Sequence, residues 1–159
     1  MTIQTADLCD EFIEKLQVVR CGLKPYGGIE SFNGPIETLR VFEDNSKVAE
    51  TVATPGEGRI LVVDGGGSTR CALLGDRLAQ KACDNGWKGI IIHGAIRDAK
   101  IISKMPLGVR ALETTPRKSI KQNRGERGVE LGFLGTRFAP GMHIYCDFDG
   151  IVLSDSALF

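Results

Sequence analysis

The sequence predicts a mixed α/β fold in which a parallel β-α-β core is followed by an antiparallel C-terminal part. Two apolar, β-branched runs at residues 59–64 and 89–93 are separated by an amphipathic segment at 76–85, as in a parallel crossover unit. Residues 129–133 alternate apolar and polar side chains, which is typical of an antiparallel strand. A chain of 159 residues, 42% hydrophobic, suits one domain spanning residues 1–159.

The N-terminal region is predicted to begin with an amphipathic helix. Leu8, Phe12 and Leu16 fall on one helical face, so a helix is expected from Thr5 to Leu16. Thr5 has a side chain suited to the N-cap. A loop rich in glycine and asparagine follows at residues 27–34.

The middle of the chain alternates predicted strands and helices. In chain order, the expected elements are a strand over 36–42, a helix over 46–54, a strand over 59–64, a helix over 76–85, a strand over 89–93, a loop over 94–98, a short helix over 98–104 and a strand over 108–112. Leu78, Ala79 and Ala82 should face inward from the crossover helix, which Gly86 should terminate. These elements make the N-terminal two thirds an α/β unit.

The tail has a different pattern. Met142, Ile144 and Cys146 alternate with other residues, and the turn dipeptide Asp149-Gly150 precedes the apolar run 151–153. An Asp-Gly pair between two such segments is a strong hairpin signal. The C-terminal third is therefore expected to be antiparallel.

Composition excludes several classes of protein. Twenty basic and twenty acidic residues cancel, so direct binding to nucleic acid is not expected. Five cysteines with no C-x-x-C pair indicate free thiols in a reducing compartment rather than a zinc site. Residues 116–127 are locally basic and form either a solvated loop or a segment that attracts anionic substrate or RNA.

Localisation is expected to be cytoplasmic. The first residues lack the basic and apolar regions of a signal peptide. The longest apolar runs, such as 60–63 and 90–92, are far too short for a membrane span.

The glycine triplet at residues 65–67 matches neither dinucleotide-binding nor P-loop spacing. A tight turn beside an active site is the favoured interpretation. His93 is interpreted as a strand-end residue, with a ligand or proton carrier as the alternative, and Trp87 as a packing residue.

Two loops around the crossover helix contain the candidate site. Residues 75–78 lie at a predicted helix N-terminus, which favours an anion, and Arg97-Asp98 follow a strand, where α/β sheets bind ligands. Arg97 can grip a carboxylate, while Asp76 and Asp98 offer the hard oxygen ligands that magnesium accepts. The alternative is that Asp76 is a helix N-cap and Arg97-Asp98 are surface charges, and spacing alone leaves both open.

Several segments carry a resemblance that spans nearly the whole chain. The sequence resembles the regulator of ribonuclease activity A family in residues 61–68, 85–90 and 94–98, and also in 8–10, 41–45 and 149–151. That family is similar to class II 4-hydroxy-4-methyl-2-oxoglutarate aldolases. The resemblance implies a swivelling β/β/α domain and a ring-shaped homotrimer with sites at subunit interfaces, and leaves open whether two trimers pair.

The resemblance also implies residue roles. Substrate binding is implied for Gly75, Asp76, Arg77, Leu78 and Arg97. The backbone amides of that loop would hold a pyruvyl group, and Arg97 would hold its carboxylate. Asp98 would bind a divalent metal, magnesium or manganese, and Asp76 would hold metal-bound water. Asp76 and Arg97 are thus the expected catalytic residues.

Two departures from the aldolases affect the expected activity. The aldolases carry a C-terminal extension that lends an acidic residue to the neighbouring site, whereas this sequence ends at Phe159, and Ile101 stands where many relatives have a carboxylate. Decarboxylation of oxaloacetate, through a pyruvate enolate that the metal stabilises, is therefore expected more than cleavage of larger aldols. The alternative is a non-catalytic regulator that inhibits a ribonuclease of the E type or binds an RNA helicase.

Overall fold

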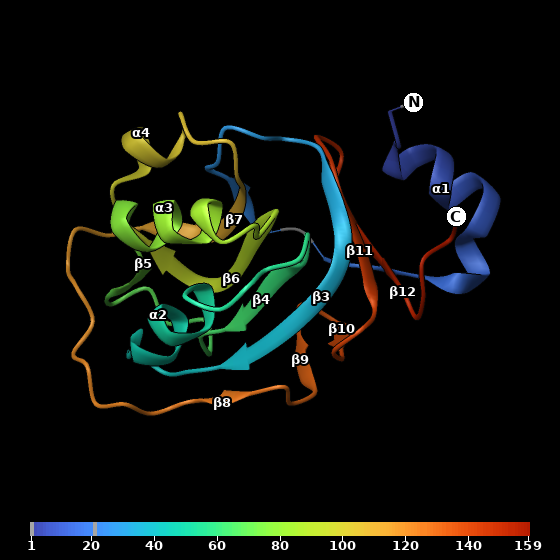
Figure 1. The fold of residues 1–159 in the computed structure, drawn as a ribbon. Helices are drawn as coiled ribbons and strands as arrows, with labels where there is room; N and C mark the ends of the chain where they lie inside the picture. Colours follow the sequence, from blue (N-terminus) through green and yellow to red (C-terminus); the bar gives the residue numbers. More distant parts are fainter. Residues whose placement is uncertain (1, 21) are drawn as a thin grey trace.

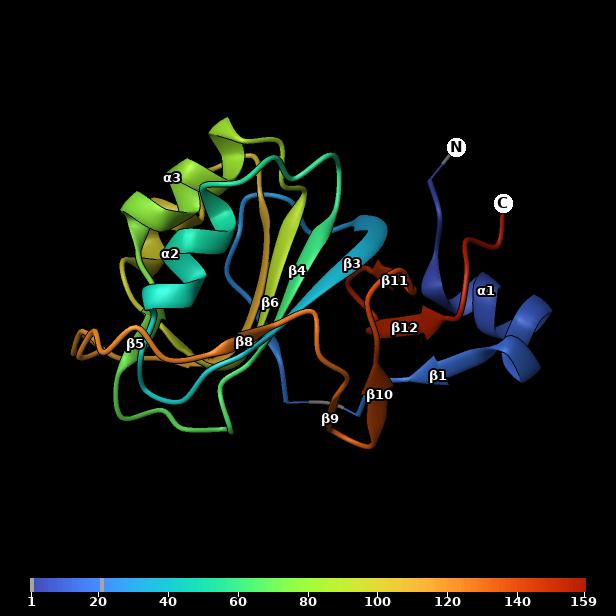
Figure 2. The same ribbon diagram turned by 60° about the horizontal axis from the view of Figure 1, so that its bottom comes forward.

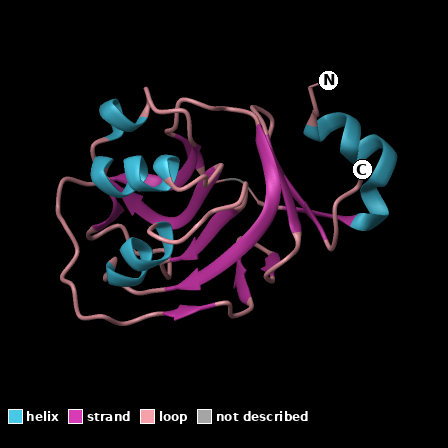
Figure 3. Ribbon diagram, viewed as in Figure 1, coloured by secondary structure: helices cyan, strands magenta, loops and turns pink. Residues whose placement is uncertain are grey.

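The computed structural model describes residues 2–20 and 22–159, and a ten-stranded sheet lies at its centre (Figures 1 and 3). The strands are β1 Leu16–Val18, β2 Lys24–Pro25, β3 Phe32–Arg40, β4 Ile60–Asp64, β5 Ala72–Leu74, β6 Gly89–Ile96, β7 Gly108–Thr114, β8 Glu126–Arg127, β9 Leu131–Phe133, β10 Thr136–Phe138, β11 His143–Cys146 and β12 Ile151–Ser154. The helices are α1 Thr5–Phe12, α2 Ser46–Val52, α3 Asp76–Asp84 and α4 Ala99–Ile102, and a 3-10 turn covers Ile13–Lys15.

The parallel core predicted from the two apolar runs is confirmed. β4 pairs in parallel with both β3 and β6, and β6 pairs in parallel with β5 and β7. Leu61 and Val63 pack into one buried cluster, while Ile60 and Val62 pack into another. This alternation buries both faces of β4, which explains why its sequence is continuously apolar.

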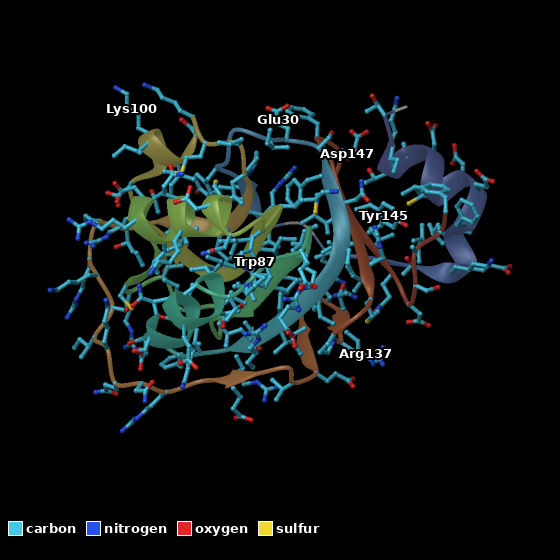
Figure 4. All side chains as sticks on the ribbon, viewed as in Figure 1. Glu30, Trp87, Lys100, Arg137, Tyr145 and Asp147 are labelled. Atoms are coloured by element: carbon cyan, nitrogen blue, oxygen red, sulfur yellow. The ribbon has the colours of Figure 1, made fainter. Side chains whose placement is uncertain are left out.

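Layers form on the two sides of the parallel sheet. Figure 2 shows α2 and α3 against one face, with β9 to β12 on the opposite side. Trp87 lies in the helix-side cluster, where its Nε1 donates to the Thr54 carbonyl oxygen at 3.0 Å. This places the tryptophan in the interior and confirms its packing role (Figure 4).

The strand β3 joins the parallel and antiparallel parts. Its first half, Phe32 to Pro35, pairs antiparallel with β11, and its second half, Ile36 to Arg40, pairs in parallel with β4. β11 then pairs with β12 through the Asp149-Gly150 hairpin predicted from the sequence. The predicted antiparallel C-terminal part is therefore confirmed.

The N-terminal helix is shorter than predicted and is anchored by a residue far along the chain. α1 ends at Phe12, and Leu16 begins β1 instead of extending the helix. Gln4, not Thr5, occupies the N-cap position. Thr5 instead donates its backbone N–H and its hydroxyl to the buried carboxylate of Asp147, both at 2.7 Å. Figure 4 places Asp147 on the side of the sheet that faces α1.

Other element boundaries differ from the sequence predictions. β3 starts four residues before the predicted strand and stops at Arg40. β6 continues to Ile96, so residues 94–96 belong to a strand and not to a loop. β5 was not predicted at all. α2 and α4 are shorter than expected, whereas the left-handed φ of 82° at Gly86 confirms the predicted end of α3.

Among the described residues, Cys9, Cys71, Cys83 and Cys146 are free thiols, as predicted. The expectation for Cys21 lies outside the described residues. In the part of the chain that the structure describes, no helix has the length and apolar character that a membrane crossing requires.

Candidate functional site

The candidate site lies where β5 and β6 end side by side. The backbone N–H of Arg97, the first residue after β6, donates to the carbonyl oxygen of Leu74, the last residue of β5, at 2.9 Å. β5 leads directly into α3 through Gly75, and β6 leads into α4 through Arg97 and Asp98. The two predicted loops are therefore brought together, at the sheet edge where α/β proteins bind ligands.

Gly75 allows the two loops to approach closely. A Cβ atom at this position would lie 2.9 Å from Asp98 Oδ2 and 3.6 Å from Arg97 Nε. Its backbone is extended, with φ at −128°, so the absence of a side chain, not an unusual conformation, is what the site requires. Any larger residue would displace the carboxylate or the guanidinium.

Asp98 is oriented by a left-handed backbone conformation. Its φ is 58°, a region that aspartate enters more readily than most residues. The side chain turns back toward α3, where Oδ2 accepts a hydrogen bond from the Asp76 backbone N–H at 3.1 Å. Gly75 is the N-cap of α3, so Asp76 is not the cap and its side chain is not used for capping.

The first turn of α3 offers free hydrogen-bond donors. The backbone N–H groups of Arg77 and Leu78 have no acceptor among the described residues, as expected at a helix start. They point in the direction of the helix N-terminus, where the helix dipole favours negative charge. A carboxylate or a keto oxygen can be held there.

Arg97 supplies a positive charge at the same place. Its side chain is half-buried, and one terminal nitrogen, Nη1, lies 3.5 Å from the Pro116 carbonyl oxygen. It forms no ion pair with any residue that the structure describes. The guanidinium is therefore free to bind an anion, a role for which its planar fork is suited.

The donor set fits a hard divalent cation. No group of three or more histidine, cysteine, aspartate or glutamate side chains able to hold a metal occurs among the described residues. Asp98 supplies one carboxylate, and Asp76, whose backbone N–H that carboxylate accepts, carries a second. Magnesium typically takes one or two carboxylates and keeps several waters, so this pair suffices for it, and manganese accepts the same ligands.

A groove not singled out from the sequence adjoins this site. It has a volume of about 520 Å³ and runs between α3 and α4, lined by Gln80, Lys100, Ile101, Lys104 and Met105. Ile101, which lines this groove, is half exposed.

The glycine triplet forms the predicted tight turn. Gly66 and Gly67 have left-handed φ values of 68° and 76°, and Asp64 Oδ1 accepts the Gly66 N–H at 2.8 Å. His93 lies inside β6 and not at its end, because the strand continues to Ile96. Its ring stacks on Phe133 with 4.6 Å between centroids, and Nδ1 is 3.6 Å from Asp64 Oδ1. The His93 ring therefore lies beside the turn, because the same Asp64 oxygen accepts the Gly66 N–H.

Comparison with known proteins places the chain in a family. The RraA-like family model, described as Aldolase/RraA, matches residues 5–153. The chain belongs to this RraA-like family of mixed α/β proteins. A relative from Laribacter hongkongensis (strain HLHK9), provisionally named 4-hydroxy-4-methyl-2-oxoglutarate aldolase, is 52% identical over 158 residues, which cover 99% of both chains.

Solved structures show the same fold. The RNA-processing inhibitor RraA from Thermus thermophilis is 42% identical with a TM-score of 0.96, covering 100% of this chain and 96% of that one. A Geobacillus kaustophilus HTA426 structure named S-adenosylmethionine: 2-dimethylmenaquinone methyltransferase is 52% identical, also with a TM-score of 0.96. The match covers 98% of this chain and 97% of that one. Because these relatives carry three different functional names, the choice of function depends on the residues of the site.

Proposed function

We propose that this protein is a divalent-metal-dependent C–C lyase acting on pyruvyl substrates in the cytoplasm, as an oxaloacetate decarboxylase and a 4-hydroxy-4-methyl-2-oxoglutarate aldolase. The observation that carries the proposal is the convergence of Gly75, Arg97 and Asp98, in which a free guanidinium, a carboxylate and a helix N-terminus meet. A protein that only docks on a partner has no need for this combination. The aldolase name of the relatives agrees with it.

Substrate binding follows from the charges. The carboxylate of a 2-oxo acid binds the guanidinium of Arg97, and its oxygens accept the free N–H groups of Arg77 and Leu78. Asp98 would hold magnesium or manganese, with Asp76 holding a neighbouring water, and the metal would supply Lewis-acid stabilisation of the negative charge that develops on the keto oxygen. These groups are fixed before the reaction, so little reorganisation is needed.

Decarboxylation then needs one proton transfer, to C3, whereas aldol cleavage also needs the 4-hydroxyl proton to be removed. The C3–C4 bond breaks, its electron pair remains with the pyruvyl fragment as an enolate, and the other fragment leaves as carbon dioxide or as a 2-oxo acid. In the aldol reaction the 4-hydroxyl proton passes to a water held by the Asp76 carboxylate. The same water returns a proton to C3, which gives pyruvate.

The proposed assembly is a ring-shaped homotrimer with the site at a subunit interface. The exposure of Arg77 and Asp98 supports it, because a site this open needs a neighbouring surface to exclude water. Sedimentation of the intact protein tests it, and a monomer that retains turnover would contradict it.

Pyruvate release from oxaloacetate is the deciding experiment. It is measured with magnesium, with excess chelator and with Asp98→Ala, after subtraction of the reaction that magnesium drives alone. We expect turnover that chelator and substitution both remove. Turnover no higher than the magnesium blank would contradict the lyase proposal.

A regulator of RNA processing is the second candidate, supported by the likeness to the inhibitor RraA. Its partner would be a ribonuclease of the E type or an RNA helicase. Inhibition of a purified ribonuclease E by wild type and by Asp98→Ala separates the two functions. Equal inhibition by both proteins would support a regulator that acts independently of the lyase site, and no inhibition would contradict it.

A further inference from the structure

A second cavity, here called the basic cavity, lies at the other end of β5. Its volume is about 390 Å³, and its charged and aromatic lining consists of Phe42, Glu43, Arg70, Arg117, Lys118 and Arg124. This volume falls within the range of small-molecule sites. The proposed pyruvyl site, formed by Gly75, Asp76, Arg97 and Asp98, follows β5, whereas Arg70 precedes the strand. The lining of the basic cavity includes none of those four residues.

Positive charge in the basic cavity is not neutralised by the protein. Glu43 is the single carboxylate in the lining, and it is paired with Arg70, whose Nε lies 2.6 Å from Glu43 Oε1. The side chains of Arg117, Lys118 and Arg124 form no ion pair with any described residue. Three cations therefore face one cavity in a chain whose formal charge is zero.

The loop that carries these cations is held in place. The buried carboxylate of Asp44 accepts the backbone N–H groups of Gln122 and Arg124, at 2.9 and 3.1 Å. Buried Ser119 donates its hydroxyl to Asn45 Oδ1 at 2.8 Å. The side chains of residues 120–127 are exposed, as predicted for a solvated loop, but a fixed backbone reduces the entropy lost when they bind a ligand.

An aromatic ring stands at the rim of the basic cavity. Phe42 is 59% exposed, although a ring of this size is usually buried. The ring packs on Gly66, where an added Cβ atom would lie 2.9 Å from Phe42 Cδ1. One edge of the ring therefore lies against the backbone of the glycine turn. A supported, exposed ring beside cations is the arrangement that stacks a nucleobase next to its phosphates.

We propose that the basic cavity binds a nucleoside diphosphate, with the diphosphate on Arg117, Lys118 and Arg124 and the base against Phe42. Arginine matches phosphate oxygens in a bidentate geometry, and several cations together favour a multiply charged anion. A polycarboxylate would use the cations and leave the ring without a role. A nucleoside diphosphate uses the cations through its phosphates and the ring through its base.

Calorimetric titration at low ionic strength tests the proposal, with ADP, pyrophosphate and adenosine as separate probes. ADP is expected to bind more tightly than pyrophosphate, and Arg117→Ala with Arg124→Ala should weaken both at least tenfold. Phe42→Ala should weaken ADP binding by about tenfold, within the range for base–aromatic stacking, and leave pyrophosphate binding unchanged. Phe42→Tyr should restore ADP binding.

Lys100→Ala with Lys104→Ala is the matched control, because it also removes two exposed cations, from α4 (Lys100, Figure 4) and from the segment that follows it. This variant should bind ADP within twofold of wild type. The proposal is overturned if ADP does not bind, if pyrophosphate binds as tightly as ADP, or if the control weakens binding as much as the arginine variant. A ten-nucleotide single-stranded RNA that binds tighter than ADP would also overturn it, in favour of a nucleic-acid site.

Discussion

The proposed pyruvyl site and the basic cavity lie at opposite ends of β5 and are built in different ways. The proposed pyruvyl site consists of residues that directly follow two adjacent strands, so the parallel pairing of β5 and β6 brings its two loops together. The basic cavity combines residues near 42, 70 and 117–124, and its loop depends on Asp44 for its position. Strand ends position residues through the sheet, whereas a long loop needs a buried anchor.

The largest expected effect is on pyruvate release, which loss of a charged side chain should lower at one site and not at the other. Arg97→Ala and Asp98→Ala should each lower pyruvate release at least a hundredfold, the scale on which a preorganised charge contributes to catalysis. Arg124→Ala removes the same guanidinium from the other site and should leave pyruvate release within twofold. Steady-state rates, with circular dichroism to verify folding, measure this. Similar losses in Arg97→Ala and Arg124→Ala would mean that the two regions form one site.

Gly75→Ala tests the close approach at the pyruvyl site. The added methyl group would lie 2.9 Å from Asp98 Oδ2, so the carboxylate or α3 must shift. A displacement of this size can cost about tenfold to a hundredfold in turnover. Gly132→Ala is the control, because the nearest atom to its new Cβ is 4.0 Å away. If Gly75→Ala keeps full turnover, the glycine is not required for catalysis.

Asp44→Asn tests the anchor of the basic cavity. The change removes the charge from buried hydrogen bonds that hold the loop, which should lower the free energy of unfolding by about 2 kcal/mol. ADP binding should weaken several-fold while pyruvate release is unchanged. Urea denaturation and calorimetry measure the two effects. Unaltered ADP binding in this variant would show that the loop does not need its anchor.

The smallest expected effect is a dependence of stability on pH. Burial alone would raise the pKa of Asp44, but hydrogen bonds from Ser46, Arg124 and Gln122 outweigh it and lower the pKa. Because the folded pKa lies below the unfolded value of about 3.9, this stabilisation is complete above that pH. It is lost as the pH falls through the folded pKa. Asp44→Asn should therefore show a flatter decline of unfolding free energy in acid, and a decline as steep as wild type would contradict this.

The sequence predicted what depends on local pattern. The runs 60–63 and 90–92 identify buried strands because both faces are covered. Asp149-Gly150 indicated the hairpin, whose turn runs from Asp147 to Gly150 with Phe148 and Asp149 at its centre. Arg97 and Asp98 were found for the same reason, since they follow a recognisable strand. Six candidate residues were placed at two loops that the structure brings together.

What depends on distant partners was not predicted. β5 has only three residues, too few for a periodic signal, and it forms because β6 offers a parallel edge. The start of β3 contains Gly34 and Pro35, poor strand formers that pairing with β11 overrides. Thr5 was assigned a capping role because nothing in the sequence connects it to Asp147. The locally basic residues 116–127 indicated the segment that supplies three cations of the basic cavity, but nothing in the sequence connects them to Phe42 and Arg70.

The double pairing of β3 has a consequence for how the molecule opens. Each half of β3 belongs to a different ladder, so the amide protons of its first half become free when β11 separates and those of its second half when β4 separates. The amides of the second half, which lies in the buried parallel core, should exchange with solvent deuterium more slowly than those of β1, an edge strand. Different exchange rates in the two halves of β3 would show that the parallel and antiparallel parts open independently, and equal rates would show that they open together.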